Sequence, residues 1–246
     1  MSLAARLLNV FAMPSEVFAS VKASTVSVAN WLVPAVLLAV VGPLTALVIL
    51  SQPNVQKQLG EAVNQQAKML DQQVQAGKLD RAKADQALAV SRTVYQPPVI
   101  HVLFGGAAAV IGVLRVFWWA FLLWLLARRF LRVRIGFIKS LEVAGLALMI
   151  SVLGAIVVLL LTLNVSAISA QPNLGLLISD LNPSRSNLLF WVLTVFSLWL
   201  VFTLSAGLSK LAEVPFLRAA WLVFAAWIIQ DSVLVLFGGV FGQLAI

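Results

Sequence analysis

Two charged side chains stand inside long apolar stretches of the sequence, and their chemistry is the first question the sequence poses. Arg115 lies within GGAAAVIGVLRVFWWAFLLWLL, and Asp231, next to Gln230, lies within AWLVFAAWIIQDSVLVLFGG. An ionised side chain near the centre of a bilayer is costly, so such a residue usually has a partner or lines a polar pathway. The predicted chemistry is therefore ion pairing inside a membrane, or the passage of a proton, ion or lipid headgroup.

The spacing of these charges predicts that they meet. Arg115 precedes Arg128 by 13 residues, and Asp231 follows Arg218 by 13 residues. At the helical rise per residue, both charges would lie roughly 20 Å from the same membrane face. We expect Arg115 and Asp231 to form an intramembrane charge pair assisted by Gln230, because pairing offsets much of the cost of burial. A structural clamp between helices and a polar path both remain open.

The sequence offers no other arrangement typical of a catalytic or metal site. It contains no cysteine and a single histidine, His101. Disulfides, thiolate chemistry and cysteine metal sites are therefore excluded. No second carboxylate accompanies Asp231 deep in an apolar run, so paired-carboxylate catalysis has no basis. We expect no enzyme activity, no cofactor and no metal.

The apolar stretches that position these residues are long enough to span a bilayer. Of the 246 residues, 61% are hydrophobic and 11% are charged. Apolar runs of about 18 residues or more predict membrane-spanning helices. The runs are continuous and do not alternate, which favours helices over strands of a barrel. The predicted fold is all-α, a polytopic membrane protein formed by one domain, residues 1–246, with a five-helix transmembrane bundle at 31–50, 99–126, 143–163, 188–206 and 219–239.

Two segments are predicted to lie outside the bilayer core. Residues 1–30 carry apolar side chains near helical spacing and predict an interfacial N-terminal helix. Residues 54–93 are polar, rich in helix-forming residues and interrupted by Gly77. They predict an extramembrane helical hairpin between spans one and two. This hairpin either is a solvated loop or docks on a protein partner, on another copy of the chain, or on the lipid surface.

Basic residues crowd between the second and third spans. The chain carries a net charge of +8, and five of its 17 basic residues are Arg128, Arg129, Arg132, Arg134 and Lys139. Such a cluster between two spans is typical of a cytoplasmic loop, which places the N-terminus in the cytoplasm and the C-terminus outside. We expect these five side chains to contact anionic lipid headgroups and not nucleic acid.

Two further patterns concern helix packing and the span ends. The pairs Gly105 with Ala109 and Ala108 with Gly112 predict close helix approach, within the bundle or between copies. Charged residues near the span ends are expected to form exposed ion pairs, which contribute little to stability. The candidates are Lys139, Glu142, Lys210 and Glu213.

The segment LTVFSLWLVFTLSAGLSKL, Leu193–Leu211, resembles the signature of the Yip1 family of multi-pass membrane proteins. The residues that match the family motif are Phe196, Trp199, Leu204, Gly207 and Leu208. Thr194 stands where the family has an acidic residue, so any role of that carboxylate is not carried over. Phe11, Pro14 and Phe18 before the first span, with the long loop after that span, extend the resemblance over nearly the whole chain.

The resemblance implies a membrane protein without enzyme activity. Eukaryotic members belong to the early secretory pathway, have a cytoplasmic N-terminus, and bind small GTPases and one another. Bacterial members share no established activity. The short region before the first span resembles the bacterial type, which implies the bacterial cytoplasmic (inner) membrane. We expect a scaffold or adaptor; the alternative is a small transporter, channel or lipid-moving protein that uses Arg115 and Asp231.

Overall fold

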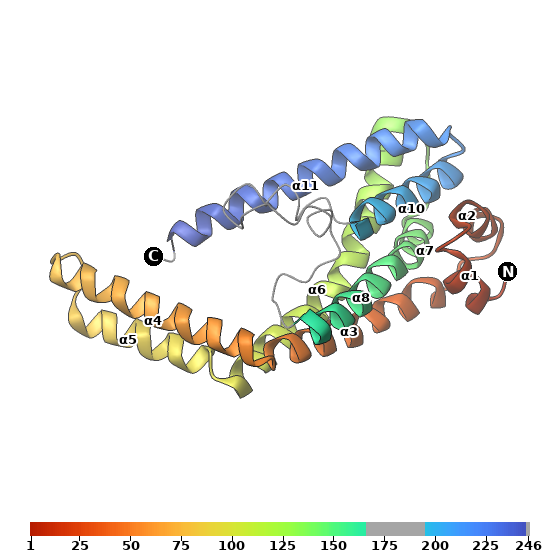
Figure 1. The fold of residues 1–246 in the computed structure, drawn as a ribbon. Helices are drawn as coiled ribbons and strands as arrows, with labels where there is room; N and C mark the ends of the chain where they lie inside the picture. Colours follow the sequence, from red (N-terminus) through yellow and green to blue (C-terminus); the bar gives the residue numbers. More distant parts are fainter. Residues whose placement is uncertain (166–194, 245–246) are drawn as a thin grey trace. The chain divides into compact units, whose positions relative to one another are not determined.

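The computed structural model describes residues 1–165 and 195–244, and it shows helices joined by turns (Figure 1). Within these ranges there is no strand, and five helical segments are long and apolar enough to cross a membrane. They are Ala29–Leu50, Pro97–Leu131, Phe137–Leu160, Val195–Ala212 and Phe216–Val233. The prediction of an all-α, polytopic membrane protein is confirmed. Residues 188–194 of the expected fourth span lie outside the described residues.

The helix boundaries follow local sequence signals. Pro14, Pro53 and Pro97 each stand in the first turn of a helix, where a missing N–H leaves no bond unmade. Gly77 follows the fourth helix with a φ of 68°, a left-handed conformation that glycine adopts without strain. In chain order the helices are α1 (Leu3–Asn9), α2 (Pro14–Ala23), α3 (Ala29–Leu50), α4 (Pro53–Gln75), α5 (Arg81–Val94), α6 (Pro97–Leu126), η1 (Ala127–Leu131), α7 (Phe137–Ala147), α8 (Met149–Val165), α10 (Val195–Ala212) and α11 (Phe216–Leu244).

The described helices fall into two compact units. The first unit contains Met1–Leu38, Gly112–Gly154 and, from its third segment, the described residues 195–244. The second unit contains Ala39–Ile111 and, beyond it, the described residues 155–165. Helices α3, α6 and α8 therefore contribute one part to each unit.

The core of the first unit lies where α10 packs against α2, α7 and α11. Val17, Phe18 and Val21 of α2 are fully buried, so the N-terminal segment is part of this core. A glycine of α10 leaves room there for a side chain of α7. A Cβ added to Gly207 of α10 would lie 2.2 Å from Val143 Cγ1 of α7.

The second unit is centred on the pair formed by α4 and α5, which pack along each other (Figure 1). Leu50, Val55 and Ile100 form a buried cluster where this pair joins the end of α3 and the start of α6. A Cβ on Gly42 of α3 would lie 3.5 Å from the Ala108 carbonyl oxygen of α6, so a small residue there serves packing within the chain. Helices α4 and α5 are not among the candidate spans found in the described residues. Their place outside the membrane stays a prediction.

Candidate functional site

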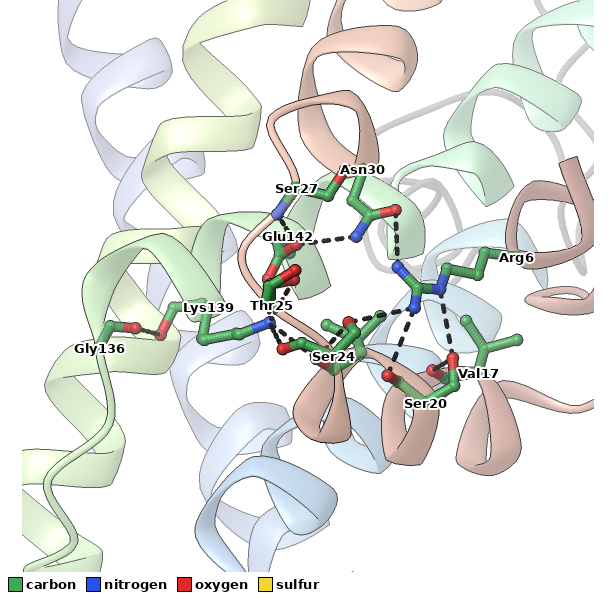
Figure 2. A network of polar contacts seen from close by, with 12 residues as sticks. Arg6, Val17, Ser20, Ser24, Thr25, Ser27, Asn30, Gly136, Lys139 and Glu142 are labelled. Carbon is green, nitrogen blue, oxygen red and sulfur yellow. Dashed lines mark hydrogen bonds and ion pairs between the residues drawn. The ribbon is translucent and has the colours of Figure 1, made fainter. Parts of the chain in front are cut away.

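A fully buried carboxylate, that of Glu142, ties the N-terminal segment to α7 (Figure 2). Its Oε1 accepts hydrogen bonds from the backbone N–H of Ser27 at 2.7 Å and from Asn30 Nδ2 at 2.8 Å. Its Oε2 forms an ion pair with Lys139 Nζ at 2.7 Å, three residues earlier on the same helix. Both oxygens therefore face positive or polar donors, which is the condition under which a buried charge is tolerated.

The ammonium of Lys139 also closes the C-terminal end of α2. Lys139 Nζ donates hydrogen bonds to the carbonyl oxygens of Val21 at 2.7 Å and Ser24 at 2.9 Å. The last carbonyls of a helix have no partner within the helix and carry partial negative charge, so a cation placed there is stabilising. Helix α7 thus supplies a cap for α2, and the Lys139 side chain is only 18% exposed.

Arg6 of α1 joins this network from the opposite side (Figure 2). Its guanidinium donates to Ser20 Oγ at 3.2 Å, to Ser24 Oγ at 3.1 Å and to Asn30 Oδ1 at 3.3 Å. Asn30 therefore bridges the two ends of the network, since its amide accepts from Arg6 and donates to Glu142. Arg6, Lys139 and Glu142 together leave the network with a net positive charge.

The sequence predicts this network only in part. The pairing of Lys139 with Glu142 was expected to be exposed, and this is wrong because the Glu142 side chain is 0% exposed. Lys139 was expected at lipid headgroups. Its ammonium instead donates hydrogen bonds to backbone carbonyls and forms an ion pair with a carboxylate inside the protein. Arg6 and Asn30 were not recognised, because their contacts join residues far apart in the chain. The available signal was the spacing of Lys139 and Glu142, which places them on one helical face.

A second ion pair joins α2 to the end of α10. Lys22 Nζ donates to a carboxylate oxygen of Glu213 at the surface. This hydrogen bond and the charge of Lys22 lower the pKa of Glu213 below its ordinary value of 4.5. The Glu213 side chain is 76% exposed, so solvent screens the pair and its contribution to stability is small. Glu213 thus pairs with a residue of α2 that the sequence had not suggested.

The motif residues of α10 pack the bundle and its N-terminal segment together. The ring of Trp199 stacks on Phe196 at a centroid distance of 6.2 Å and meets the edge of Phe11 at 6.0 Å. Gly207 allows α10 to approach α7, and Leu208 is fully buried. These contacts indicate that the motif residues pack helices together.

The deep polar residues of α6 and α11 lie close to one another. Trp118 Nε1 donates a hydrogen bond to Gln230 Oε1, and Gln230 Nε2 donates to Asp231 Oδ1 at 3.3 Å. Arg115 and Asp231 interact electrostatically, although no ion pair within 4.0 Å joins them among the described residues. Arg115 is exposed on the surface of the protein and Asp231 is half-buried. The predicted charge pair stays a prediction.

The four arginines of the predicted headgroup cluster lie on the turn from α6 to α7. Arg128, Arg129, Arg132 and Arg134 are all exposed. In the part of the chain that the structure describes, none of them forms an ion pair with a carboxylate. Their contact with lipid stays a prediction.

The buried network is suited to holding helices and not to reaction. Oε1 of Glu142 accepts two hydrogen bonds, and its Oε2 is ion-paired with Lys139 without a hydrogen bond. The Lys139 ammonium contacts carbonyls and this carboxylate, so both charged groups are engaged within the protein. Across residues 1–165 and the described C-terminal part, no three His, Asp or Glu side chains gather as a metal site would require.

Comparison with known proteins gives one result. A family model, described as the Yip1 domain, matches residues 8–238. No curated protein and no solved structure matches the chain.

Proposed function

Because the chain belongs to the Yip1 family, a family of multi-pass membrane proteins, we propose that it acts as a scaffold or adaptor in the membrane, without enzyme activity. The observation that carries this proposal is the pair α4 and α5. This pair is not among the candidate spans in the described residues, and it carries two exposed apolar side chains, Met69 and Val90. We infer that these two side chains belong to a surface that binds a protein partner.

Helices α4 and α5 are braced against each other, which suits a rigid binding surface. Arg81 Nη1 pairs with Asp71 at 2.7 Å, and Ser91 Oγ donates to Gln66 Oε1 at 2.6 Å. Met69 and Val90 nevertheless remain 41% and 58% exposed. A helix pair held in this way binds a partner helix or a second copy without a large ordering cost.

The experiment uses the absence of native cysteine, because any introduced thiol is then the only one. A photocrosslinking maleimide is attached at Val90→Cys and, as a matched control, at Lys83→Cys, which is exposed on the same helix. The scaffold proposal predicts one discrete adduct of fixed mass in native membranes from Val90→Cys and a much weaker one from Lys83→Cys. Equal or diffuse labelling from both positions contradicts a specific binding surface.

We propose the same orientation that the basic cluster predicts, in the bacterial inner membrane. Lys83→Cys should react with a membrane-impermeant maleimide added to intact spheroplasts, which expose the outer face of the inner membrane. Lys210→Cys, exposed at the end of α10, should react only after permeabilisation. The reverse pattern overturns the orientation.

A second candidate function is transport or lipid movement, and one observation favours it. Arg115 is exposed on α6 and interacts electrostatically with Asp231, but it forms no ion pair in the described residues. Trp118, Gln230 and Asp231 are joined by hydrogen bonds. Unsealed polar groups at membrane depth are typical of a polar path. Reconstituted protein should then move ions or labelled lipid across liposomes, and Asp231→Asn should abolish the movement. Liposomes that remain tight with the native protein exclude this function.

A further inference from the structure

The turn between α6 and α7 has an uncommon backbone. After α6 the chain winds into η1, a π-helical turn, and the Ala127 carbonyl accepts hydrogen bonds from the N–H groups of Arg132 and Val133. Arg132 ends the turn in the left-handed conformation, with a φ of 59°. A residue with a Cβ is strained in this conformation, and glycine is not. Arg132 therefore occupies a position whose backbone conformation favours glycine.

The turn also has a surplus of positive charge. Arg128, Arg129, Arg132 and Arg134 are exposed, and no carboxylate pairs with them in the residues that the structure describes. The nearby acidic side chains have other partners, because Glu142 pairs with Lys139 and Glu213 pairs with Lys22. Four guanidinium groups are thus available to an anion from outside the chain.

Apolar rings lie beside these arginines. The Arg128 guanidinium carbon sits 4.8 Å from the centroid of the Trp124 ring, a cation–π contact that holds it in place. Trp124 in turn meets the edge of Phe137 at 6.4 Å. Phe130 of η1 is 57% exposed, and Ile138, at the start of α7, is 44% exposed. Exposed apolar side chains interleaved with arginines are unsuited to open solvent and suited to a membrane interface.

The position of the turn agrees with its composition. One candidate span ends at Leu131 and the next begins at Phe137. Because only five residues join the two candidate spans, we expect residues 132–136 to lie among lipid headgroups, whatever the orientation of the chain.

We propose that the η1 turn is a binding site for an anionic phospholipid, with its phosphate held by Arg129, Arg132 and Arg134. The planar guanidinium fork matches two phosphate oxygens at once, which a lysine ammonium does not. Arg128, stacked on Trp124, supplies a fixed positive charge, and Phe130 enters the acyl region below the headgroup. Lys139 takes no part, since its ammonium is used by Glu142. This inference does not depend on the proposed scaffold role.

Arg132→Gly is the sharpest variant, because it removes the whole side chain with its guanidinium while glycine suits the left-handed backbone. The full-length protein, delipidated in a neutral detergent, is titrated with short-chain phosphatidylglycerol or phosphatidylcholine and bound lipids are counted by native mass spectrometry. Arg132→Gly should weaken phosphatidylglycerol binding about five-fold, and Arg129→Gln with Arg132→Gly about thirty-fold. The control removes two charges elsewhere, as Lys68→Gln with Lys83→Gln, and should bind as the native protein does.

Three outcomes overturn the proposal. The arginine variants bind phosphatidylglycerol unchanged while their melting temperatures show that they are folded. The lysine control loses as much binding as the arginine variants, which would mean attraction by net charge alone. Soluble glycerol phosphate displaces the lipid completely at equal concentration, which would assign the turn to a free phosphate and not to a membrane lipid.

Discussion

Gly145 of α7 crosses Trp31 of α3 so closely that a Cβ on the glycine would lie 2.4 Å from the Trp31 Cα and 2.8 Å from its Cβ. The crossing stands three residues after Glu142 and one residue after Asn30, in the same region as the polar network. Close packing and buried hydrogen bonds therefore depend on the same approach of two helices.

The first prediction concerns this crossing. Gly145→Ala places a methyl group against backbone that has no room to yield, and it should destabilise the protein by about 3 kcal/mol, the upper end for overpacking. Gly207→Ala meets side chains, those of Val143 and Phe18, and no backbone atom among its nearest neighbours, so the cost should be smaller. Gly106→Ala meets nothing within 4 Å and is the control. Thermal unfolding in detergent should rank the melting temperatures in that order, and an unchanged Gly145→Ala contradicts the packing.

The second prediction concerns the buried carboxylate. Glu142→Ala leaves Lys139 without its anion and Asn30 without an acceptor, so it should cost about 3 to 5 kcal/mol. Glu142→Gln keeps an oxygen for Asn30 and should cost less. A double-mutant cycle with Lys139→Met should give a coupling energy of about 1 to 3 kcal/mol. Additive single costs would mean that the two side chains do not interact.

The third prediction concerns pH. The pKa of Glu213 is lowered by Lys22, so its stabilising effect is present above the unfolded-state pKa and is lost as pH falls through the lower folded-state pKa. The native protein should therefore have a slightly higher melting temperature than Glu213→Gln at about pH 7, and the two should converge when the pH falls well below 4.5. Melting curves of both proteins across this range give the test. A difference that grows on acidification contradicts the pairing with Lys22.

The fourth prediction concerns the deep charges. If Arg115 and Asp231 pair within the bilayer, Asp231→Asn should destabilise the protein in lipid nanodiscs by about 3 kcal/mol, because the arginine loses its anion. The exchanged variant, Arg115→Asp with Asp231→Arg, should recover part of this loss. Recovery is measured by the melting temperature relative to each single variant. An exchanged variant that melts no higher than the less stable single variant contradicts the pairing.

Hydropathy predicted the fold because a membrane allows few solutions. Every backbone group in lipid needs a partner, so long apolar runs such as the one around Trp31 are restricted to helices. The motif of Phe196, Trp199 and Gly207 was also visible in the sequence, since its residues are close together in one helix.

The polar network was not predictable in the same way. Asn30 and Glu142 are separated by 112 residues, and neither residue type is unusual at a span end. Lys139 was assigned to lipid because four arginines precede it in the sequence. Its short distances to Glu142 and to an α2 carbonyl distinguish it from those arginines. Three-dimensional proximity, and not composition, distinguishes a structural cation from an exposed one.

The cap that α7 provides for α2 sets an order for the assembly of the chain. Helix α2 is made early in translation, but Lys139, which caps its carbonyl at Val21, follows 118 residues later. At the usual rate of synthesis that interval is on the order of ten seconds. During it Arg6 can already bond Ser20, Ser24 and Asn30, whereas the Asn30 amide still lacks its acceptor on Glu142. Helix α7 and, later, α10 must therefore be made before α2 can complete its packing.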